Sequence, residues 1–266
     1  MQGKTGIAAE KIVLLLVEII MILERLKRKI KMLTSSKQEA ESLFWRDHMK
    51  NMENWFTGEL PYYYKTPSPE ETEKIKASGL KDSSILTWFK LHQQVKYLAD
   101  LELPENAFAG MKLLDIGAGP MPSATVFKNC EVYCLDPLLH KYLEVGYPLH
   151  YYDNCKFIHA FSENIPVKDG FFDAVISVNA IDHVDDIHKT SMEINRVLKK
   201  NGLFRMHVHY HKATKLEPLE ITDAMFLRIF SWCPDLHKVS ENKSSFSTTL
   251  DADETFVLWS NFSCKT

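Results

Sequence analysis

The segment that most constrains the fold of this chain is residues 112–122, with the sequence KLLDIGAGPMP. The mostly apolar residues 112–116 predict a buried strand, with Asp115 near its carboxyl end. Gly117 and Gly119 let the main chain turn tightly without a Cβ in the way of a ligand. The backbone amides of such a turn are expected to point at the ligand. A second predicted strand ends nineteen residues beyond Gly117 in Asp136, whose carboxylate can accept both hydroxyls of a ribose.

The spacing of the glycines separates two classes of nucleoside ligand. Dinucleotide-binding turns follow the pattern G-x-G-x-x-G, in which the last glycine lets the helix pack closely over a pyrophosphate. This chain has Pro122 at that position. The sequence therefore favours a smaller ligand without phosphates and argues against a nicotinamide-dependent oxidoreductase.

The glycine segment and four segments after it resemble the class I S-adenosylmethionine-dependent methyltransferases in order and spacing, over roughly residues 111–212. The matching segments are 114–119, 162–167, 171–177, 181–184 and 195–204. The resemblance implies an α/β fold with a doubly wound, Rossmann-like sheet of seven mostly parallel strands, and S-adenosylmethionine as cofactor. It also implies methyl transfer to an oxygen or nitrogen of a small or medium acceptor, such as a sugar or a lipid-linked metabolite. The alternative is a non-catalytic binding or assembly subunit, because a fold does not determine a function.

Strand and helix patterns alternate in the second part of the chain. Strands are expected near 112–116, 131–135, 156–160, 173–178 and 203–209, followed by a helix over 221–230 and two strands at 236–239 and 255–259. This alternation predicts a parallel sheet with helices on both faces. We therefore expect residues 111–266 to form the cofactor-binding domain.

Ligands of a doubly wound sheet bind beyond the carboxyl ends of its strands. The resemblance implies that the methionine part of the cofactor lies against Asp115 and the turn formed by Gly117, Ala118 and Gly119. It implies that Asp136 holds the ribose hydroxyls.

The adenine end departs from the family pattern. The family often has an acidic residue after the third strand for the adenine amino group, whereas this chain has Phe161 and Ser162 there, followed by Glu163. Adenine recognition is therefore expected to rely on stacking and a backbone N–H. Asn179, just past the fourth strand, is expected either at the methionine end of the cofactor or in the core.

Two groups of residues are candidates for the chemistry. A hydroxyl or amine acceptor must lose a proton, which calls for a general base. Asp182 and His183 lie where the resemblance places residues that face the acceptor, with a structural role as the alternative for His183. His207, His209 and His211 share one side of a predicted strand. His209 and His211 are expected toward the pocket, and the sequence favours no metal although three histidines can bind zinc or iron.

The first 110 residues predict two helical units. Apolar residues from Ile12 to Leu33 recur at steps of four and three, so residues 1–37 predict a helix that pairs with another helix or a second copy, lies on a membrane surface, or packs on the body. The apolar run is short for a membrane span. Residues 38–110, with helices expected over 39–55 and 84–101 and aromatic residues such as Tyr62 to Tyr64, resemble the cap over the family's substrate pocket.

The amino-acid composition indicates which binding partners and which cellular compartment to expect. The net charge of −3 gives no general attraction to nucleic acid, so a small-molecule acceptor is expected instead. Five cysteines without a C-x-x-C pair predict no disulfide framework, which favours a cytoplasmic protein, with the N-terminal segment as the one candidate for membrane association.

Overall fold

The computed structural model describes residues 22, 23, 26, 27, 31, 34–56, 70, 73, 83–149, 154–242 and 254–263. Most of the predicted N-terminal helix and the aromatic residues Tyr62 to Tyr64 lie outside the described residues. None of the helices within the described part combines the length and apolar composition needed to cross a bilayer.

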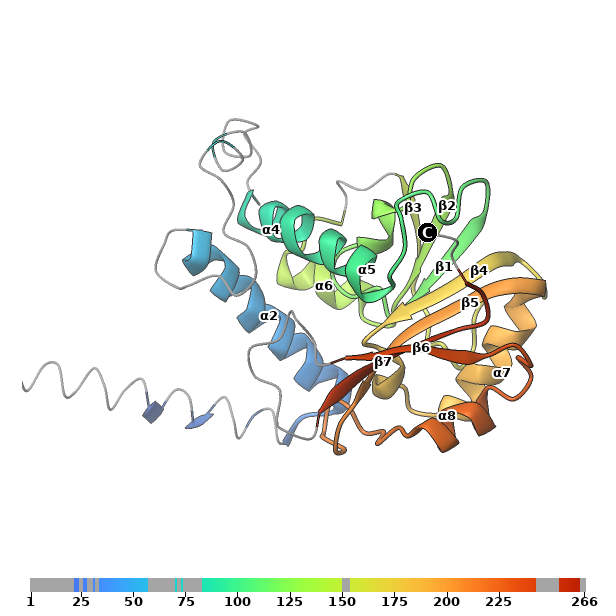
Figure 1. Ribbon diagram of the computed structural model, residues 1–266. Coiled ribbons are helices and arrows are strands. Elements are labelled where there is room, and N and C mark those ends of the chain that lie inside the picture. The colour runs from blue at the N-terminus through green and yellow to red at the C-terminus, as the bar shows by residue number, and fades with distance from the viewer. Residues whose placement is uncertain are drawn as a thin grey trace, which may run out of the picture.

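A seven-stranded sheet forms the body of the protein (Figure 1). Its strands are β1 (Lys112–Ile116), β2 (Glu131–Leu135), β3 (Cys155–Ile158), β4 (Phe172–Val178), β5 (Leu198–Tyr210), β6 (His237–Asn242) and β7 (Thr255–Ser260). The strand order is β3-β2-β1-β4-β5-β7-β6, with β1 to β5 parallel and β7 antiparallel to both of its neighbours. The predicted doubly wound, mostly parallel sheet is confirmed, and its strand order reverses between β1 and β4, where ligands of such sheets bind.

Helices cover both faces of this sheet. They are α2 (Lys37–Phe56), α4 (Ser83–Trp88), the π-helical η1 (Phe89–Gln93), α5 (Gln94–Asp100), α6 (Leu139–Val145), α7 (Ile187–Val197) and α8 (Asp223–Ile229), with 3₁₀ turns η2 (Ser123–Val126) and η4 (Ile181–His183). Figure 1 shows α2, α4 and α6 beside one another, away from α7 and α8.

Alternating side chains of the strands divide the core in two. Leu114 of β1 packs with residues of α7 and α8, whereas its neighbour Leu113 packs with Tyr97 of α5. This is the period of two expected of a sheet buried on both faces. Because α5 packs directly on the sheet, the helical segment before residue 111 belongs in part to the body. A third cluster joins α4 and α6 next to the glycine turn.

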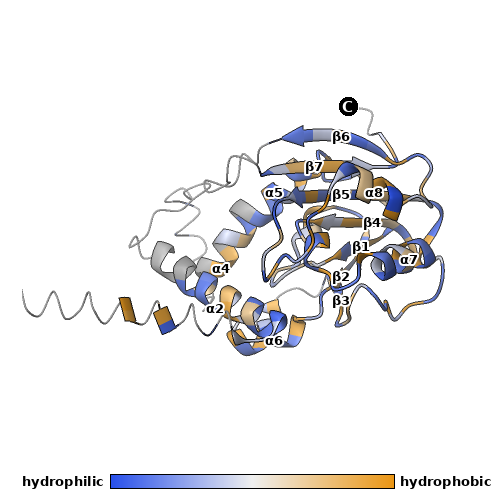
Figure 2. Ribbon diagram, turned by 90° about the horizontal axis from the view of Figure 1, so that it is seen from below, coloured by the Kyte–Doolittle hydropathy of each residue, from blue (hydrophilic) through white to orange (hydrophobic). Residues whose placement is uncertain are grey.

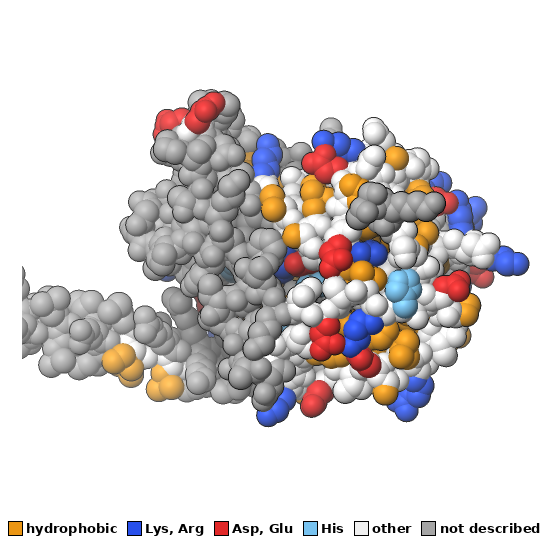
Figure 3. Space-filling view, in the orientation of Figure 1, with side chains coloured by type: hydrophobic (Ala, Val, Ile, Leu, Met, Phe, Trp, Pro, Cys, Tyr) orange, Lys and Arg blue, Asp and Glu red, His pale blue; other side chains and the backbone are white. Residues whose placement is uncertain are grey.

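The β6 edge of the sheet has a polar composition that discourages pairing with other chains. Figure 2 shows β6 as largely hydrophilic and the neighbouring β7 as more apolar, and β7 is the more buried of the two. Polar edge strands discourage pairing with other chains. On the face shown in Figure 3, acidic and basic side chains are interspersed among the described residues.

Arg196, near the end of α7, holds the loop that follows β3. Its guanidinium donates to the carbonyls of Val167 at 2.7 Å and Ile165 at 2.8 Å and pairs with Glu193. Hydrogen bonds of charged groups contribute about 1.5–3 kcal/mol each. We expect Arg196→Ala to lower the free energy of unfolding in urea by about 2–3 kcal/mol.

Lys189→Ala on the same helix is the matched control. Lys189 is exposed, and an exposed ion pair such as the one it forms with Asp186 adds little to stability. Equal urea midpoints for the two variants would show that Arg196 does not stabilise the loop.

Candidate functional site

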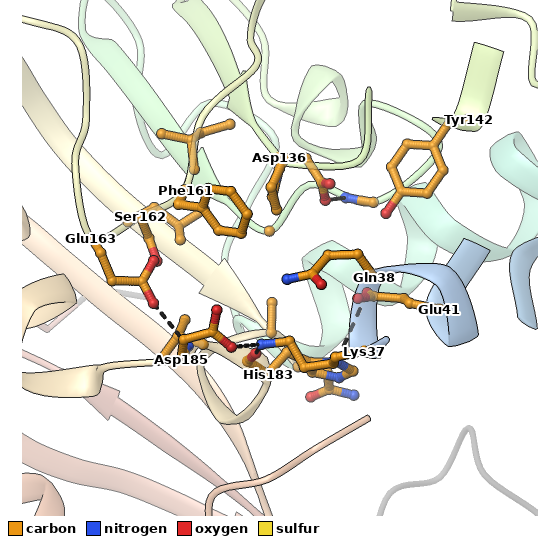
Figure 4. A pocket seen from close by; sticks show the side chains of 18 of the residues that line it. Lys37, Gln38, Glu41, Asp136, Tyr142, Phe161, Ser162, Glu163, His183 and Asp185 are labelled. Carbon is orange, nitrogen blue, oxygen red and sulfur yellow. Dashed lines mark hydrogen bonds and ion pairs between the residues drawn. The ribbon is translucent and has the colours of Figure 1, made fainter. Parts of the chain in front are cut away.

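A hollow of about 710 Å³, a volume that includes space open to solvent, lies at the carboxyl ends of β1, β2 and β4, with α2 along one side (Figure 4). It is lined by Lys37, Gln38, Glu41, Trp45, Ile116, Gly117, Gly119, Leu135, Asp136, Pro137, Tyr142, Phe161, Ser162, Glu163, Asn179, Ala180, His183, Val184 and Asp185. A second hollow of about 550 Å³ meets it at the glycine turn and reaches Gln93, Lys96 and Ala118. The two hollows share Trp45 and Asn179.

The glycine turn has the predicted backbone shape but not the predicted hydrogen bonding. Gly117 and Gly119 both have φ of +70°, and a Cβ on Gly117 would lie 2.3 Å from the Cβ of Ala180. The amides of Gly117 and Ala118 donate to the carbonyl of Leu135 at 2.9 and 3.2 Å. The prediction that these amides point at a ligand is therefore wrong, because the turn uses them to attach itself to the end of β2.

Asp136 completes this attachment. Its Oδ2 accepts from the amide of Gly119 at 2.9 Å, and its Oδ1 accepts from the amide of Leu138 at 2.8 Å. Burial raises the pKa of Asp136, and the two amides act against that shift. Each carboxylate oxygen can accept a second hydrogen bond, so Asp136, which lines the hollow, keeps the capacity to bind ribose hydroxyls.

Asp115 lies beneath the turn and is fully buried. Neither of its carboxylate oxygens has a hydrogen-bond partner among the described residues. Burial raises the pKa of Asp115 well above its usual value, and the nearby Tyr97 hydroxyl lowers it without reaching hydrogen-bonding geometry. A buried carboxyl group without a partner is costly, and a cationic group bound over the turn would relieve that cost.

The three residues predicted at the adenine end have different surroundings. Phe161 lines the hollow with 46% of its surface exposed, which leaves a ring face free for stacking. The Ser162 hydroxyl instead shares a hydrogen bond of 2.9 Å with Thr190. Glu163 accepts from the amide of Asp185 at 2.8 Å and so holds the chain after η4.

Asn179 links β4 to β5. It has φ of +50°, its amide donates to the carbonyl of His207, and its Oδ1 lies 2.7 Å from the Nδ1 of His207. Burial lowers the pKa of His207 to about 3, so its ring is neutral and Nδ1–H donates to Asn179. Asn179 therefore pairs with a buried histidine and also lines both hollows, and its contact with the methionine end of the cofactor stays a prediction.

Of the four predicted catalytic residues, one lines the hollow and three do not. Among the described residues that line the hollow, His183 is the one histidine. Asp182, His209 and His211 form a group behind it, because the Asp182 side chain turns away from the hollow to meet His211 at 3.0 Å. Asp182 raises the pKa of His211 to about 9 through this contact.

His183 lies between two carboxylates. Its Nδ1 is 3.9 Å from Glu41 of α2, and its Nε2 is 3.7 Å from Glu217. Burial raises the pKa of Glu41 to about 7, although His183 opposes the shift. Glu217 has a lowered pKa, chiefly because of its contact with His209.

Three α2 residues of this site, Lys37, Gln38 and Glu41, were not predicted from the sequence. Figure 4 shows Lys37, Gln38 and Glu41 facing Asp136 and His183 across the hollow. Lys37 also donates to the carbonyl of His183 at 2.7 Å and pairs with Asp185. Lys37, Glu41 and Trp45 recur every four residues and so share one face of a helix. That stripe of polar and aromatic residues is the signal that could have identified them.

The raised pKa of Glu41 predicts a pH dependence of stability. A carboxyl group that binds its proton more tightly when folded contributes stability below its unfolded pKa near 4.5, and that contribution is lost as the pH rises through about 7. We expect the free energy of unfolding of the wild type to fall relative to that of Glu41→Gln between these pH values, by up to about 3 kcal/mol. Urea titrations at several pH values measure this. Glu39→Gln, at an exposed position on the same helix, should keep the wild-type slope, and a Glu41→Gln curve parallel to wild type would contradict the prediction.

Comparison with known proteins identifies the domain. Residues 114–206 match a family described as a methyltransferase domain. The chain is 30% identical over 103 residues to the uncharacterized methyltransferase YcgJ of Bacillus subtilis, covering 37% of this chain and 41% of that protein. It is 32% identical over 107 residues to the sterol 24-C-methyltransferase ERG6B of Gibberella zeae, covering 37% of this chain and 27% of that protein. The matches thus span less than half the length of either curated relative.

A solved structure supports the fold. The methyltransferase bound to the Trm112 activator of Haloferax volcanii aligns with a TM-score of 0.50 at 16% identity, over 73% of this chain and 98% of that one. The buried Asp115, the glycine turn that excludes a Cβ at 117 and the carboxylate of Asp136 fit the cofactor of such a fold. Together with the matched family, these features show that residues 114–206 lie in a methyltransferase domain of the class I fold, whose cofactor is S-adenosylmethionine.

Proposed function

We propose that this protein transfers the methyl group of S-adenosylmethionine to an oxygen or nitrogen of a small or medium acceptor. The observation that carries the proposal is the hollow at the strand ends, which joins Asp136, Phe161 and His183. The first two can hold a nucleoside, and the third can accept a proton. A non-catalytic subunit that binds the cofactor would need Asp136 and Phe161 but not His183.

The two adjoining hollows suit the two parts of the cofactor. The adenosine would lie in the hollow at the strand ends, with Phe161 against the adenine and Asp136 on the ribose hydroxyls. The methionine part would extend past the glycine turn into the second hollow. Because the turn amides are already bonded, Lys96 and Gln93 are the groups that would bind its carboxylate there.

The chain's own contribution to the reaction is alignment and proton removal. S-adenosylmethionine supplies an activated methyl group, so holding the acceptor atom in line with it is the main task of the protein. His183 would take the acceptor's proton. The carboxylates of Glu41 and Glu217 on either side of the ring would stabilise the resulting imidazolium.

The α2 side of the hollow suits a polar acceptor with a flat or ring-shaped surface. Trp45 and Tyr142 provide aromatic surface there, and Lys37 and Glu41 provide a donor and an acceptor. A sugar or the headgroup of a lipid-linked metabolite combines both features. In this proposal α2 serves as the cap over the acceptor.

Calorimetric titration with S-adenosylhomocysteine tests cofactor binding directly. We expect one site per chain in the wild type and at least about tenfold weaker binding by Asp136→Ala, because the ribose loses a charged acceptor. Asp235→Asn, at an exposed position outside both hollows, is the control and should bind as the wild type does.

The outcomes of two assays separate the alternatives. No binding by the folded wild type would contradict the proposal. Binding without transfer of a labelled methyl group to any acceptor extract would favour the non-catalytic subunit.

A further inference from the structure

Four side chains that can ligate a metal meet where η4, the end of β5 and the loop before α8 come together. They are Asp182, His209, His211 and Glu217, and their ligand atoms all lie within 4.8 Å of one another. Four ligands at about 2.1 Å from a tetrahedral zinc ion lie roughly 3.4 Å apart, so small side-chain rotations would close this set around one ion. We propose that these residues form a binding site for a divalent transition-metal ion such as Zn²⁺.

One atom of the group lacks the hydrogen bond that a buried polar atom normally has. The Asp182 side chain is 1% exposed, and its Oδ1 has no hydrogen-bond partner among the described residues. Buried polar atoms are nearly always paired, so an unpaired carboxylate oxygen inside a group of metal-ligating side chains points to a cation.

The two imidazoles are oriented as ligands are. Nδ1 of His211 lies 2.7 Å from the carbonyl of Lys212, and a proton held there directs Nε2 toward Asp182. Histidine ligands typically donate their second ring N–H to a carbonyl or carboxylate in this way. Nδ1 of His209 lies 3.9 Å from Glu217, and its Nε2 lies 3.6 Å from Glu254, which can play the orienting role.

Charge and ligand type select the ion. Two carboxylates balance the charge of one dication, and the ion would take the place of the proton that lies between Asp182 and His211. Imidazole ligands suit zinc and its neighbours in the first transition row, whereas magnesium and calcium prefer oxygen ligands alone. The site differs from the three histidines considered from the sequence, because His207 instead pairs with Asn179 and stacks on Phe256.

Such an ion would tie three separate segments together. Asp182 comes from η4, the histidines from β5 and the residue after it, and Glu217 from the loop that leads toward α8. Glu217 also lies 3.7 Å from His183, so the ion would fix one wall of the hollow. The inference does not depend on methyl transfer, and metal binding can be measured without an acceptor.

The test uses the full chain, freed of metal with a chelator and titrated with ZnCl₂ and separately with MgCl₂ by calorimetry. We expect one Zn²⁺ per chain, a higher melting temperature with Zn²⁺, and no saturable binding of Mg²⁺. Co²⁺ should give the visible absorption of a tetrahedral site. Glu217→Gln, which changes a partly exposed residue, and His209→Asn should each bind Zn²⁺ at least about tenfold more weakly.

His188→Asn is the control, because His188 is exposed on α7 and outside the group. It should bind Zn²⁺ as the wild type does. The proposal is overturned if the wild type binds no Zn²⁺ stoichiometrically or shows no tetrahedral Co²⁺ spectrum. It is equally overturned if Glu217→Gln and His209→Asn remain folded by circular dichroism and retain wild-type affinity.

Discussion

Replacing Gly117 with alanine is expected to weaken S-adenosylhomocysteine binding more than about a hundredfold and to lower the free energy of unfolding by at least about 2 kcal/mol. The new Cβ would lie 2.3 Å from the Cβ of Ala180, whereas carbon atoms in contact are normally about 3.5–4.0 Å apart. Relieving this overlap would push the turn away from the end of β4. The hydrogen bonds that hold the turn to Leu135 would then be lost. Calorimetry and urea titration measure the two effects.

Alanine substitutions at two other glycines distinguish the effect of steric crowding from the effect of backbone strain. Gly110 has φ of +79° with nothing within 4 Å of an added Cβ, and Gly119 has the same φ as Gly117 with its nearest atom 4.0 Å away. Alanine at either position should lower the free energy of unfolding only by the left-handed strain of about 1–2 kcal/mol. The double variant Gly117→Ala with Ala180→Gly should recover much of the loss. Equal losses in the free energy of unfolding at 110, 117 and 119 would contradict the role given to Ala180.

The sheet could be predicted because each strand is a short apolar run that ends in a turn residue. The strand predicted at 131–135 has the bounds found for β2, and that at 112–116 has those of β1. β5 was placed at 203–209 but begins at Leu198, before Asn201 and Gly202, which mark a turn in the sequence. Asn201 adopts φ of +60°, so the chain turns locally without leaving the sheet. Local propensity does not reveal such pairing.

The site was predictable where it depends on strand ends and not where it depends on partners far along the chain. Asp136 and Phe161 follow strands, so the topology alone brings them to one edge. Glu41 reaches His183 across 142 positions of sequence (183 − 41), because α2 packs on α6 and α4. No local pattern specifies that contact.

The hydrogen bonds of the glycine turn show the same limit. A turn with two glycines leaves its amides free in principle. Here the carbonyl of Leu135 accepts two of them and Asp136 accepts the third, because β2 ends directly beside the turn. The sequence places the turn and the acid on neighbouring strands but does not specify that they bond to each other.

His207 and His209 of β5 lie in different surroundings for a similar reason. Their alternation puts them on one side of the strand, as predicted, but Phe256 of β7 stacks on both His207 and His209. This stacking holds His207 beside Asn179, whereas His209 lies against His211 and Glu217. One predicted row of imidazoles thus becomes two separate environments.

Replacing His183 with glutamine is expected to lower the rate of methyl transfer by about 10²–10⁴-fold, the range contributed by a general base, while S-adenosylhomocysteine binding is unchanged. Glutamine keeps the size and polarity of the side chain but cannot take the acceptor's proton at neutral pH. His183 is 26% exposed at the hollow, so the substitution leaves no large buried cavity. The measurement is transfer of a labelled methyl group to an acceptor found by screening extracts, alongside calorimetry with S-adenosylhomocysteine.

Glu41→Gln is the comparison variant for this measurement, and His188→Gln is its control. Glu41 lies 3.9 Å from Nδ1 of His183 and acts through that ring, so its loss should reduce the rate less than the loss of His183 does. His188 is exposed on α7 and should leave the rate as in the wild type. A His183→Gln enzyme that binds the cofactor product and transfers methyl groups at the wild-type rate would remove His183 from the chemistry. Proton removal would then fall to Glu41, whose pKa of about 7 suits a base at neutral pH.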